Sequence, residues 1–301
     1  MAFSVDAFDL PPSPVQQLTL STDLEKTGVT LWVKRDDLLR FPQTPELCGN
    51  KVRKLKYNLQ AAARSGKETL LTFGGAYSNH IAAVAAAGFL FGFKTIGIIR
   101  GEPAKQLNPV LQLARERGME LHYLDRTTYR RRNESGFQNE LINRFGDVYL
   151  LPEGGTNELA VQGAAELVGE TEQLLGWNPD HWLLAAGTGG TAAGIAAGLN
   201  GAARLTAVAV VSDPAIPDAI RDAAGGDEKT GNWSVNFDYT FGGYAKKTPE
   251  LTAFIQEFQQ NYGIPIEPIY TGKAFFAVFD LIKNGYFSPG SRILVVHTGG
   301  V

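Results

Sequence analysis

The sequence has little of what secreted, membrane-bound and nucleic-acid-binding proteins depend on. Its single cysteine, Cys48, excludes an internal disulfide and suits a reducing compartment. No stretch approaches the roughly 20 uninterrupted apolar residues of a membrane span. The start of the chain carries Asp6 and Asp9 and no basic segment before an apolar run, so we expect no secretory signal. A net charge of −3 gives no electrostatic reason to expect nucleic acid or an anionic membrane. We therefore expect a cytoplasmic protein that acts on a small molecule.

A chain of 301 residues is about twice the length of a typical domain, so two domains are expected. Strand-like apolar runs alternate with helix-like runs, which predicts an α/β protein with mainly parallel strands and helices on both faces. The expected strands are 29–34, 69–73, 94–99, 120–124, 148–151, 182–186, 207–211 and 292–297. Helices are expected from 51 onward and over 78–91, 108–117, 129–145, 158–175, 192–199, 249–262 and 273–284. The polar stretch 225–236 is expected to be a surface loop.

The run Gly187-Thr188-Gly189-Gly190-Thr191 follows an apolar strand and opens a helix of small residues. Backbone N–H groups and the helix dipole converge there on an anion. Gly187, Gly189 and Ala192 also fit the dinucleotide pattern G-x-G-x-x-A, with Asp213 after the next strand. A Walker phosphate loop is excluded because no Gly-Lys-Ser/Thr follows. A phosphate site, a dinucleotide site and a tight turn without a ligand all stay open.

A second glycine turn, Gly74-Gly75-Ala76-Tyr77-Ser78-Asn79-His80, opens another predicted helix. Ser78 or Asn79 can cap this helix and leave its first amides facing a substrate carboxylate. The simpler interpretation is that Ser-Asn is only a good cap, and His80 has the same two interpretations. The other histidines, His122, His181 and His297, show no metal-ligand spacing, so we assign no metal.

Lys51 lies at the start of a predicted helix, with Arg53, Lys54 and Lys56 close by. One interpretation is a basic, solvated helix start. Cations at a helix N-terminus oppose the macrodipole, however, so this cluster is unfavourable unless an anion compensates it or it has a function. The same field should lower the pKa of Lys51. A partly neutral amine is the nucleophile that forms a Schiff base with an aldehyde cofactor.

A series of motifs stands in order along the chain: Lys34-Arg35-Asp36-Asp37-Leu38, Gly49-Asn50-Lys51-x-Arg53-Lys54-Leu55, Gly74-Gly75-x-x-Ser78-Asn79-His80, Gly187-Thr188-Gly189-Gly190-Thr191, Tyr270-Thr271-Gly272-Lys273 and His297-Thr298-Gly299-Gly300. Together they resemble the 1-aminocyclopropane-1-carboxylate deaminase/D-cysteine desulfhydrase family, over nearly the whole chain. Several ordered motifs are far more specific than any one glycine loop.

The resemblance implies a pyridoxal 5'-phosphate enzyme with the tryptophan synthase β-subunit fold, fold type II. This fold has two open, mainly parallel sheets with helices on both faces. The implied domains are a large cofactor-binding domain of residues 1–50 and 152–301 and a small domain of residues 51–151. The implied assembly is a homodimer.

The resemblance also implies roles for single residues. Lys51 would bind the cofactor aldehyde, the 187–191 loop would hold the phosphate, and Asn79 would contact the ring oxygen. The implied cofactor-binding residues are Lys51, Asn50, Asn79, Gly187, Thr188, Gly189, Gly190, Thr191, Thr271 and Thr298. The implied catalytic residues are Lys51, Ser78, Tyr244 and Tyr270, and the implied substrate-binding residues are Tyr77, Ser78, Asn79 and His80.

Two positions bear on the substrate. Ring-opening members of the family usually have Glu and Leu where this chain has Thr271 and Thr298, whereas desulfhydrase-like members have hydroxyl residues. A neutral threonine near the pyridine nitrogen leaves a weaker electron sink, which suits the loss of a good leaving group. We expect β-elimination of the D-cysteine desulfhydrase type, giving pyruvate, ammonia and sulfide. Tyr77 replaces the glutamine of the best-known members, which puts the specificity of the pocket in question.

Three alternatives stay open. One is 1-aminocyclopropane-1-carboxylate deaminase itself. Another is a homologue that binds the cofactor or an amino acid without turnover, against which the retained Lys51 and Ser78 argue. The third is a racemase, dehydratase or other lyase on the same fold, which sequence alone separates poorly.

Overall fold

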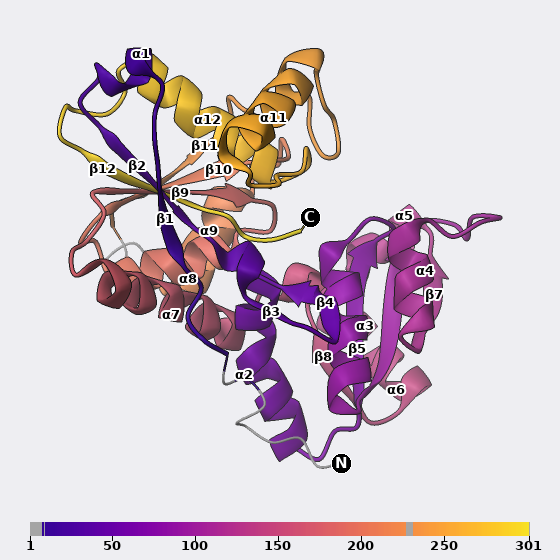
Figure 1. Ribbon diagram of the computed structural model, residues 1–301. Coiled ribbons are helices and arrows are strands. Elements are labelled where there is room, and N and C mark those ends of the chain that lie inside the picture. The colour runs from indigo at the N-terminus through magenta and orange to yellow at the C-terminus, as the bar shows by residue number, and fades with distance from the viewer. Residues whose placement is uncertain (1–7, 9, 227–230, 301) are drawn as a thin grey trace. The chain divides into compact units, whose positions relative to one another are not determined.

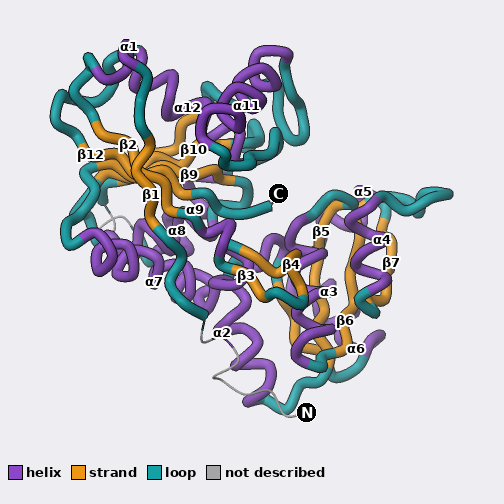
Figure 2. Tube along the Cα trace, viewed as in Figure 1, coloured by secondary structure: helices purple, strands orange, loops and turns teal. Residues whose placement is uncertain are grey.

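The computed structural model describes residue 8, residues 10–226 and residues 231–300 (Figures 1 and 2). Asp6 and Asp9, on which the prediction about a secretory signal depends, lie outside the described residues, as does part of the predicted 225–236 loop. No helix in the described part of the chain is long and apolar enough to cross a membrane. The contacts within the chain divide it into two compact units.

The first unit contains Arg40–Ala160 and the described residues before Pro11. Its four-stranded parallel sheet has the order β7-β6-β5-β8. These strands are β5 (Thr69–Gly75), β6 (Lys94–Arg100), β7 (Met119–Leu124) and β8 (Val148–Leu151), and an antiparallel pair, β3 (Arg40–Phe41) and β4 (Thr44–Cys48), precedes them. The helices are α2 (Asn50–Arg64), α3 (Asn79–Phe91), α4 (Pro109–Glu116), α5 (Arg126–Arg130) and α6 (Ser135–Phe145).

Two packing arrangements fix the first sheet. Alternate strand residues such as Leu71 and Phe73 pack with Tyr129 of α5 and Phe137 of α6. The alanine-rich helix α3 is buried continuously from His80 to Gly88. A helix that is apolar on all sides can be stable only when it is enclosed. The turn that carries Tyr77 and Ser78 therefore leads directly into a helix that is buried in the first unit.

The second unit contains the described residues of 11–39, 161–226 and 231–300. Its six-stranded sheet has the order β1-β2-β12-β9-β10-β11, and only the β1–β2 pair is antiparallel. The strands are β1 (Val15–Leu18), β2 (Thr30–Lys34), β9 (His181–Ala186), β10 (Arg204–Ala209), β11 (Trp233–Asn236) and β12 (Arg292–Val296). The helices are α1 (Thr22–Glu25), most of α7 (Glu158–Leu175), α8 (Gly190–Leu199), α9 (Ile216–Ala224), α11 (Pro249–Tyr262) and α12 (Thr271–Lys283).

Helices cover both faces of the six-stranded sheet, as Figure 2 shows. Trp182 and Leu184 of β9 face α7, α8 and α9, whereas Leu183, between them, faces α11 and α12. Successive strand side chains point to opposite faces, so a run that is apolar at every position is buried on both sides. The continuous apolar runs 182–186 and 293–296 therefore lie at the centre of the sheet.

The predicted α/β class with parallel strands is confirmed, whereas the predicted domain limits after residues 50 and 151 stay a prediction. The single helix predicted over 129–145 was wrong: the backbone of Glu134 is extended, which separates α5 and a short 3-10 turn from α6. The 225–236 loop was also wrong at its end, because β11 pairs there with β10. The strand predicted over 207–211 lies earlier, at Arg204–Ala209, in register with β9.

Two glycines in helices of the first unit make a matched test of this packing. A Cβ atom on Gly88 would lie 2.3 Å from Thr95 Cγ2 and 2.8 Å from the Phe93 carbonyl oxygen, whereas a Cβ on Gly136 would meet nothing within 4 Å. We expect Gly88→Ala to lower the free energy of unfolding by about 1–3 kcal/mol through overpacking. Gly136→Ala should raise it by up to ~1 kcal/mol through helix propensity. Urea denaturation measures both, and equal effects would contradict the packing described.

Candidate active site

Lys51 stands in the first turn of α2, directly after β4 and Gly49. Gly49 has φ 58° and ψ −134°, a backbone conformation that only glycine adopts readily, and it turns the chain from strand to helix. Lys51 is half-buried, and its Nζ donates to Asn50 Oδ1 at 2.8 Å. Burial lowers its pKa from 10.5 to about 8, and Cys48 acts in the opposite direction. The predicted lowering is confirmed, but burial rather than the helix dipole is its main cause.

Lys54, one turn further along α2, is buried rather than solvated, as is Arg53. The Lys54 ammonium donates to the Gly154 carbonyl and to Thr156 Oγ1. Burial and the charge of Lys51 lower the pKa of Lys54 well below its usual value. The interpretation of this helix start as a solvated basic face was therefore wrong.

The turn after β5 has the predicted cap. Ser78 is the N-cap of α3, and its Oγ accepts the Ile81 N–H at 3.4 Å. A Cβ on Gly74 would lie 2.5 Å from Ile81 Cγ1, so this close turn requires glycine. Asn79 is the first residue of α3 and is half-buried, whereas Tyr77 is 57% exposed. Ser78, Asn79 and Tyr77 thus lie together at one end of α3.

His80 lies inside the first unit, with 2% of its surface exposed. Its Nε2 lies 2.8 Å from Thr72 Oγ1, which donates to the Leu151 carbonyl at 3.1 Å. The hydrogen bond between Thr72 and His80 joins β5 to the first turn of α3. Burial, with the charges of Lys54 and Lys51, lowers the pKa of His80 well below its usual value, and a hydrogen bond to the Pro152 backbone opposes this. His80 is therefore a neutral imidazole, and its substrate-binding role stays a prediction.

In the second unit, β9 leads through Gly187 and Thr188 into α8. Gly189 is the N-cap of α8 with φ 80°, and its lack of a side chain leaves the helix without a side-chain cap. A Cβ at Gly189 would lie 2.7 Å from Ile220 Cγ1, and one at Gly187 would lie 3.2 Å from Tyr270 Cε1. Thr188 is exposed and Thr191 is buried. Asp213, the candidate ribose ligand, accepts the Ala215 N–H at 3.0 Å.

The start of α12 carries Tyr270 and Thr271. Glu267 caps it: its Oε1 accepts the N–H groups of Tyr270 and Thr271, each at 2.8 Å, and its Oε2 accepts that of Ile269 at 2.7 Å. Burial raises the pKa of Glu267, and these backbone N–H bonds oppose the rise. The Thr271 hydroxyl accepts the Glu267 N–H at 3.0 Å and lies 3.3 Å from Glu267 Oε1. Sequence reasoning missed Glu267.

Two more predicted site residues lie in the second unit. Tyr244 lies near the start of α12, and Thr298 follows β12. The Tyr244 ring packs against the Tyr270 ring with centroids 6.1 Å apart. Thr298 is 6% exposed and follows His297, whose Nε2 donates to the Pro265 carbonyl at 2.6 Å. His297 Nδ1 then accepts the Gly299 N–H at 3.3 Å, which fixes the turn that holds Thr298.

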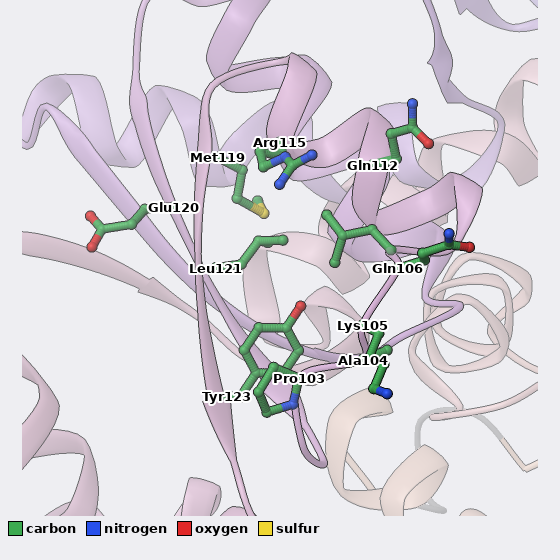
Figure 3. A pocket seen from close by; sticks show the side chains of 11 residues that line it. Pro103, Ala104, Lys105, Gln106, Gln112, Arg115, Met119, Glu120, Leu121 and Tyr123 are labelled. Atoms are coloured by element: carbon green, nitrogen blue, oxygen red, sulfur yellow. The ribbon is translucent and has the colours of Figure 1, made fainter.

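A hollow of about 830 Å³ lies elsewhere in the first unit, against α4, β7 and the residues that precede α4 (Figure 3). Lys105, Arg115, Met119 and Tyr123 are among its lining residues, and none of the predicted site residues is. Within the described residues, no three histidine, cysteine or acidic side chains converge as a metal site.

Known proteins resemble this chain over nearly its whole length. The model of the pyridoxal-phosphate dependent enzyme family matches residues 9–299. The bifunctional D-cysteine desulfhydrase/1-aminocyclopropane-1-carboxylate deaminase of Arabidopsis thaliana mitochondria is 30% identical, over 96% of this chain and 76% of its own. The 1-aminocyclopropane-1-carboxylate deaminase of Allorhizobium ampelinum is 29% identical, over 98% and 96%. A crystal structure of an ACC deaminase homologue has a TM-score of 0.80 at 28% identity, over 99% of this chain and 94% of that chain.

The chain is therefore a pyridoxal phosphate-dependent enzyme. Within that class it belongs to the 1-aminocyclopropane-1-carboxylate deaminase/D-cysteine desulfhydrase family. The predicted family, cofactor and fold type II are confirmed. The cofactor of the family is pyridoxal phosphate and not a dinucleotide, whereas the binding of its phosphate by the 187–191 loop stays a prediction.

The lowered pKa of Lys51 makes a prediction about the cofactor-free protein. Trapping of added pyridoxal 5'-phosphate on Lys51 by borohydride should increase as the pH rises through about 8 and should be lost as the pH falls below it. An ordinary lysine would show this increase near pH ~10.4. Peptide mapping of the reduced adduct against pH measures the profile, with Lys51→Arg as the control. A midpoint near the ordinary value, or an adduct on another lysine, would contradict the assignment.

Proposed function

We propose that this enzyme catalyses β-elimination from a small D-amino acid, with D-cysteine as the best substrate. The Cα proton is removed, the Cβ–S bond breaks, and its electron pair leaves with sulfur as sulfide. The remaining enamine takes up water and becomes pyruvate and ammonia. When bound, pyridoxal 5'-phosphate supplies the electron sink that acidifies the Cα–H bond.

The residues present fit this cofactor. Lys51 would hold it through its amine, which burial keeps partly neutral near pH 8 and which can also take the Cα proton. Gly187, Gly189 and the start of α8 would hold the phosphate, since a backbone without side chains admits it closely and the helix dipole favours its charge. The other proposed cofactor ligands are Asn50, Asn79, Thr188, Gly190, Thr191, Thr271 and Thr298.

Ser78, Asn79 and Tyr77 would face the substrate at the N-terminus of α3, where backbone amides suit a carboxylate. Tyr244 and Tyr270, whose rings pack on each other, are proposed as catalytic residues together with Lys51 and Ser78, and His80 is proposed as a substrate-binding residue. We also propose a homodimer in the cytoplasm and domains of residues 1–50 with 152–301 and of residues 51–151. These last proposals rest on the family resemblance and, for the compartment, on the single cysteine.

The observation that carries the choice of substrate is the environment of Thr271. This residue is neutral and 1% exposed. The acid beside it, Glu267, has both carboxylate oxygens bound to backbone N–H groups, so it serves as a helix cap. Position 271 therefore has no carboxylate that could stabilise a protonated pyridine nitrogen. Elimination of thiolate needs less electron withdrawal than the opening of a carbon ring.

A second candidate is 1-aminocyclopropane-1-carboxylate deaminase, which opens the ring to 2-oxobutyrate and ammonia. The names of both relatives given above include this activity, and one of them includes both. The two candidates share the cofactor and Lys51 and differ in the bond that breaks. Product analysis separates them.

The phosphate contact can be tested with two glycines of the same backbone conformation. Gly189 and Gly201 both have φ +80°, but a Cβ at Gly201 would meet nothing within 4 Å. Alanine at either position costs about 1–2 kcal/mol of backbone strain. At Gly189 the new Cβ also lies 2.7 Å from Ile220 Cγ1, so Tm is measured beside Kd to separate lost packing from lost cofactor binding. Only Gly189→Ala should also weaken cofactor binding, at least ~10-fold, which is about 1.4 kcal/mol. Absorbance titration of the cofactor-free variants measures Kd, and an equal loss in Gly201→Ala would point to general destabilisation.

The substrate choice is tested with D-cysteine and 1-aminocyclopropane-1-carboxylate side by side. We expect the wild type to form pyruvate and sulfide readily and little 2-oxobutyrate. Thr271→Glu combined with Thr298→Leu should lower the elimination rate by ~10²-fold, the loss seen when one oriented hydrogen-bonding group is removed. Thr271→Ser, which keeps the hydroxyl, is the control. Efficient 2-oxobutyrate formation by the wild type would favour the deaminase instead.

A further inference from the structure

Lys273, in the first turn of α12, has a fully buried side chain with 0% of its surface exposed. Its Nζ donates to three main-chain carbonyls, those of Val210 at 3.1 Å, Thr240 at 2.8 Å and Gly243 at 2.8 Å. An ammonium group has three protons, so these bonds use all of them. No described carboxylate forms an ion pair with Lys273. Backbone carbonyls therefore replace the water of this buried cation, and the charge of Glu267 also favours its charged form.

Two of the three carbonyls belong to the loop Thr240–Ala245, whose backbone is unusual. Phe241 and Ala245 have φ 51° and 56°, and Gly242 and Gly243 have φ 88° and 112°. Residues with a Cβ rarely adopt positive φ, so the rest of the structure must impose this shape. Helix α12 makes two kinds of contact with this loop: the hydrogen bonds from Lys273 and the packing of Phe276 on Phe241. Just before the loop, the Tyr239 hydroxyl also donates to Asp280 of α12.

The same loop carries Tyr244. Its ring packs against Tyr270, whose Cε1 would in turn lie 3.2 Å from a Cβ on Gly187. The cation under the loop, Tyr244, Tyr270 and the glycine turn therefore form one continuous arrangement within the second unit. A change in the shape of the loop would move the Tyr244 ring.

We infer that the carbonyls of Val210, Thr240 and Gly243 form a cation site that is filled by the ammonium of Lys273, and that Lys273 is a positioning residue for Tyr244. Converging carbonyl oxygens are the ligands that replace the hydration shell of potassium and of similar monovalent cations. A cation tethered to α12 cannot dissociate, so it shapes the loop whatever the surrounding salt. The part of this inference that concerns catalysis rests on the proposed role of Tyr244 at the substrate.

The experiment is chemical rescue. Lys273→Ala should create an empty site that takes up ethylammonium, ammonium or potassium, but not tetramethylammonium, which has no N–H group and is too large. At constant ionic strength, we expect the Tm of the cofactor-free variant to rise with ethylammonium concentration, while the wild type does not respond. Lys283→Ala removes an exposed lysine from the last turn of the same helix and is the matched control. It should behave like the wild type.

Activity gives the second measurement, with whichever amino acid the wild type converts. Lys273→Ala should lose ~10²-fold in kcat/KM, the loss expected when a group is misplaced by about 1 Å, and ethylammonium should restore most of it. If Lys273 acts through Tyr244, then adding Tyr244→Phe to Lys273→Ala should cost little more and should abolish the rescue of activity, while the Tm rise remains.

The two measurements distinguish failure of the cation site from failure of the proposed substrate. A cation-specific Tm rise supports the site even if D-cysteine proves not to be a substrate, because that measurement needs no turnover. Loss of Tm and activity that no cation restores would overturn it. Should Lys273→Ala fail to fold, Lys273→Met, of similar length and without charge, replaces it. A folded Lys273→Met with wild-type Tm and kcat/KM would equally overturn the inference.

Discussion

The parallel pairing of β12, β9 and β10 is the constraint on which the second unit depends. Parallel strands end at the same edge of a sheet, so the segments that follow them are neighbours. β9 is followed by the glycine turn at 187–189, β12 by Thr298, and β10 by Val210, whose carbonyl binds Lys273. In the first unit, β5 ends in the Ser78 turn in the same way. The carboxyl ends of the parallel strands thus carry the 187–189 turn, Val210, Thr298 and the Ser78 turn, whereas Lys51 follows the antiparallel strand β4.

The enzyme also shows how the partners of a buried amine set its chemistry. Removing a lysine from water disfavours its charged form, and hydrogen-bonding partners decide how far. Lys34 is held by Glu170 and the Ser13 carbonyl, Lys54 by a carbonyl and a hydroxyl, and Lys273 by three carbonyls. Those three lysines are buried, whereas Lys51 is half-buried and donates to the side-chain amide of Asn50. The Lys51 amine is therefore the most accessible of the four.

Much of this could be predicted from sequence because the signals are local. Continuous apolar runs bounded by glycine mark buried parallel strands, and a Ser-Asn pair before an apolar run marks a helix cap. The strand β11 could not be found this way, since the short polar segment Trp233–Asn236 is a strand only through its pairing with β10. The roles of Glu267 and Lys273 could not be predicted. Glutamate and lysine are mostly exposed, and only tertiary contacts show that these two are buried. The hydrogen-bond partners of Lys54 lie in the 154–156 turn, about 100 residues further along the chain, where no local signal points to them.

The contacts of Lys273 also bear on the order of folding. Its carbonyl partners lie 63, 33 and 30 residues away in the sequence, and all precede it. During synthesis, β10 and the loop Thr240–Ala245 leave the ribosome before α12 exists, so the loop has nothing to hold its positive-φ backbone. Contacts of long sequence separation form late because the intervening chain must first be closed. The sheet itself is completed later still, because its strand β12 follows α12 in the chain and joins β2 to β9. A chain that stops before α12 therefore lacks both the contacts that hold this loop and the strand that joins the two parts of the second sheet.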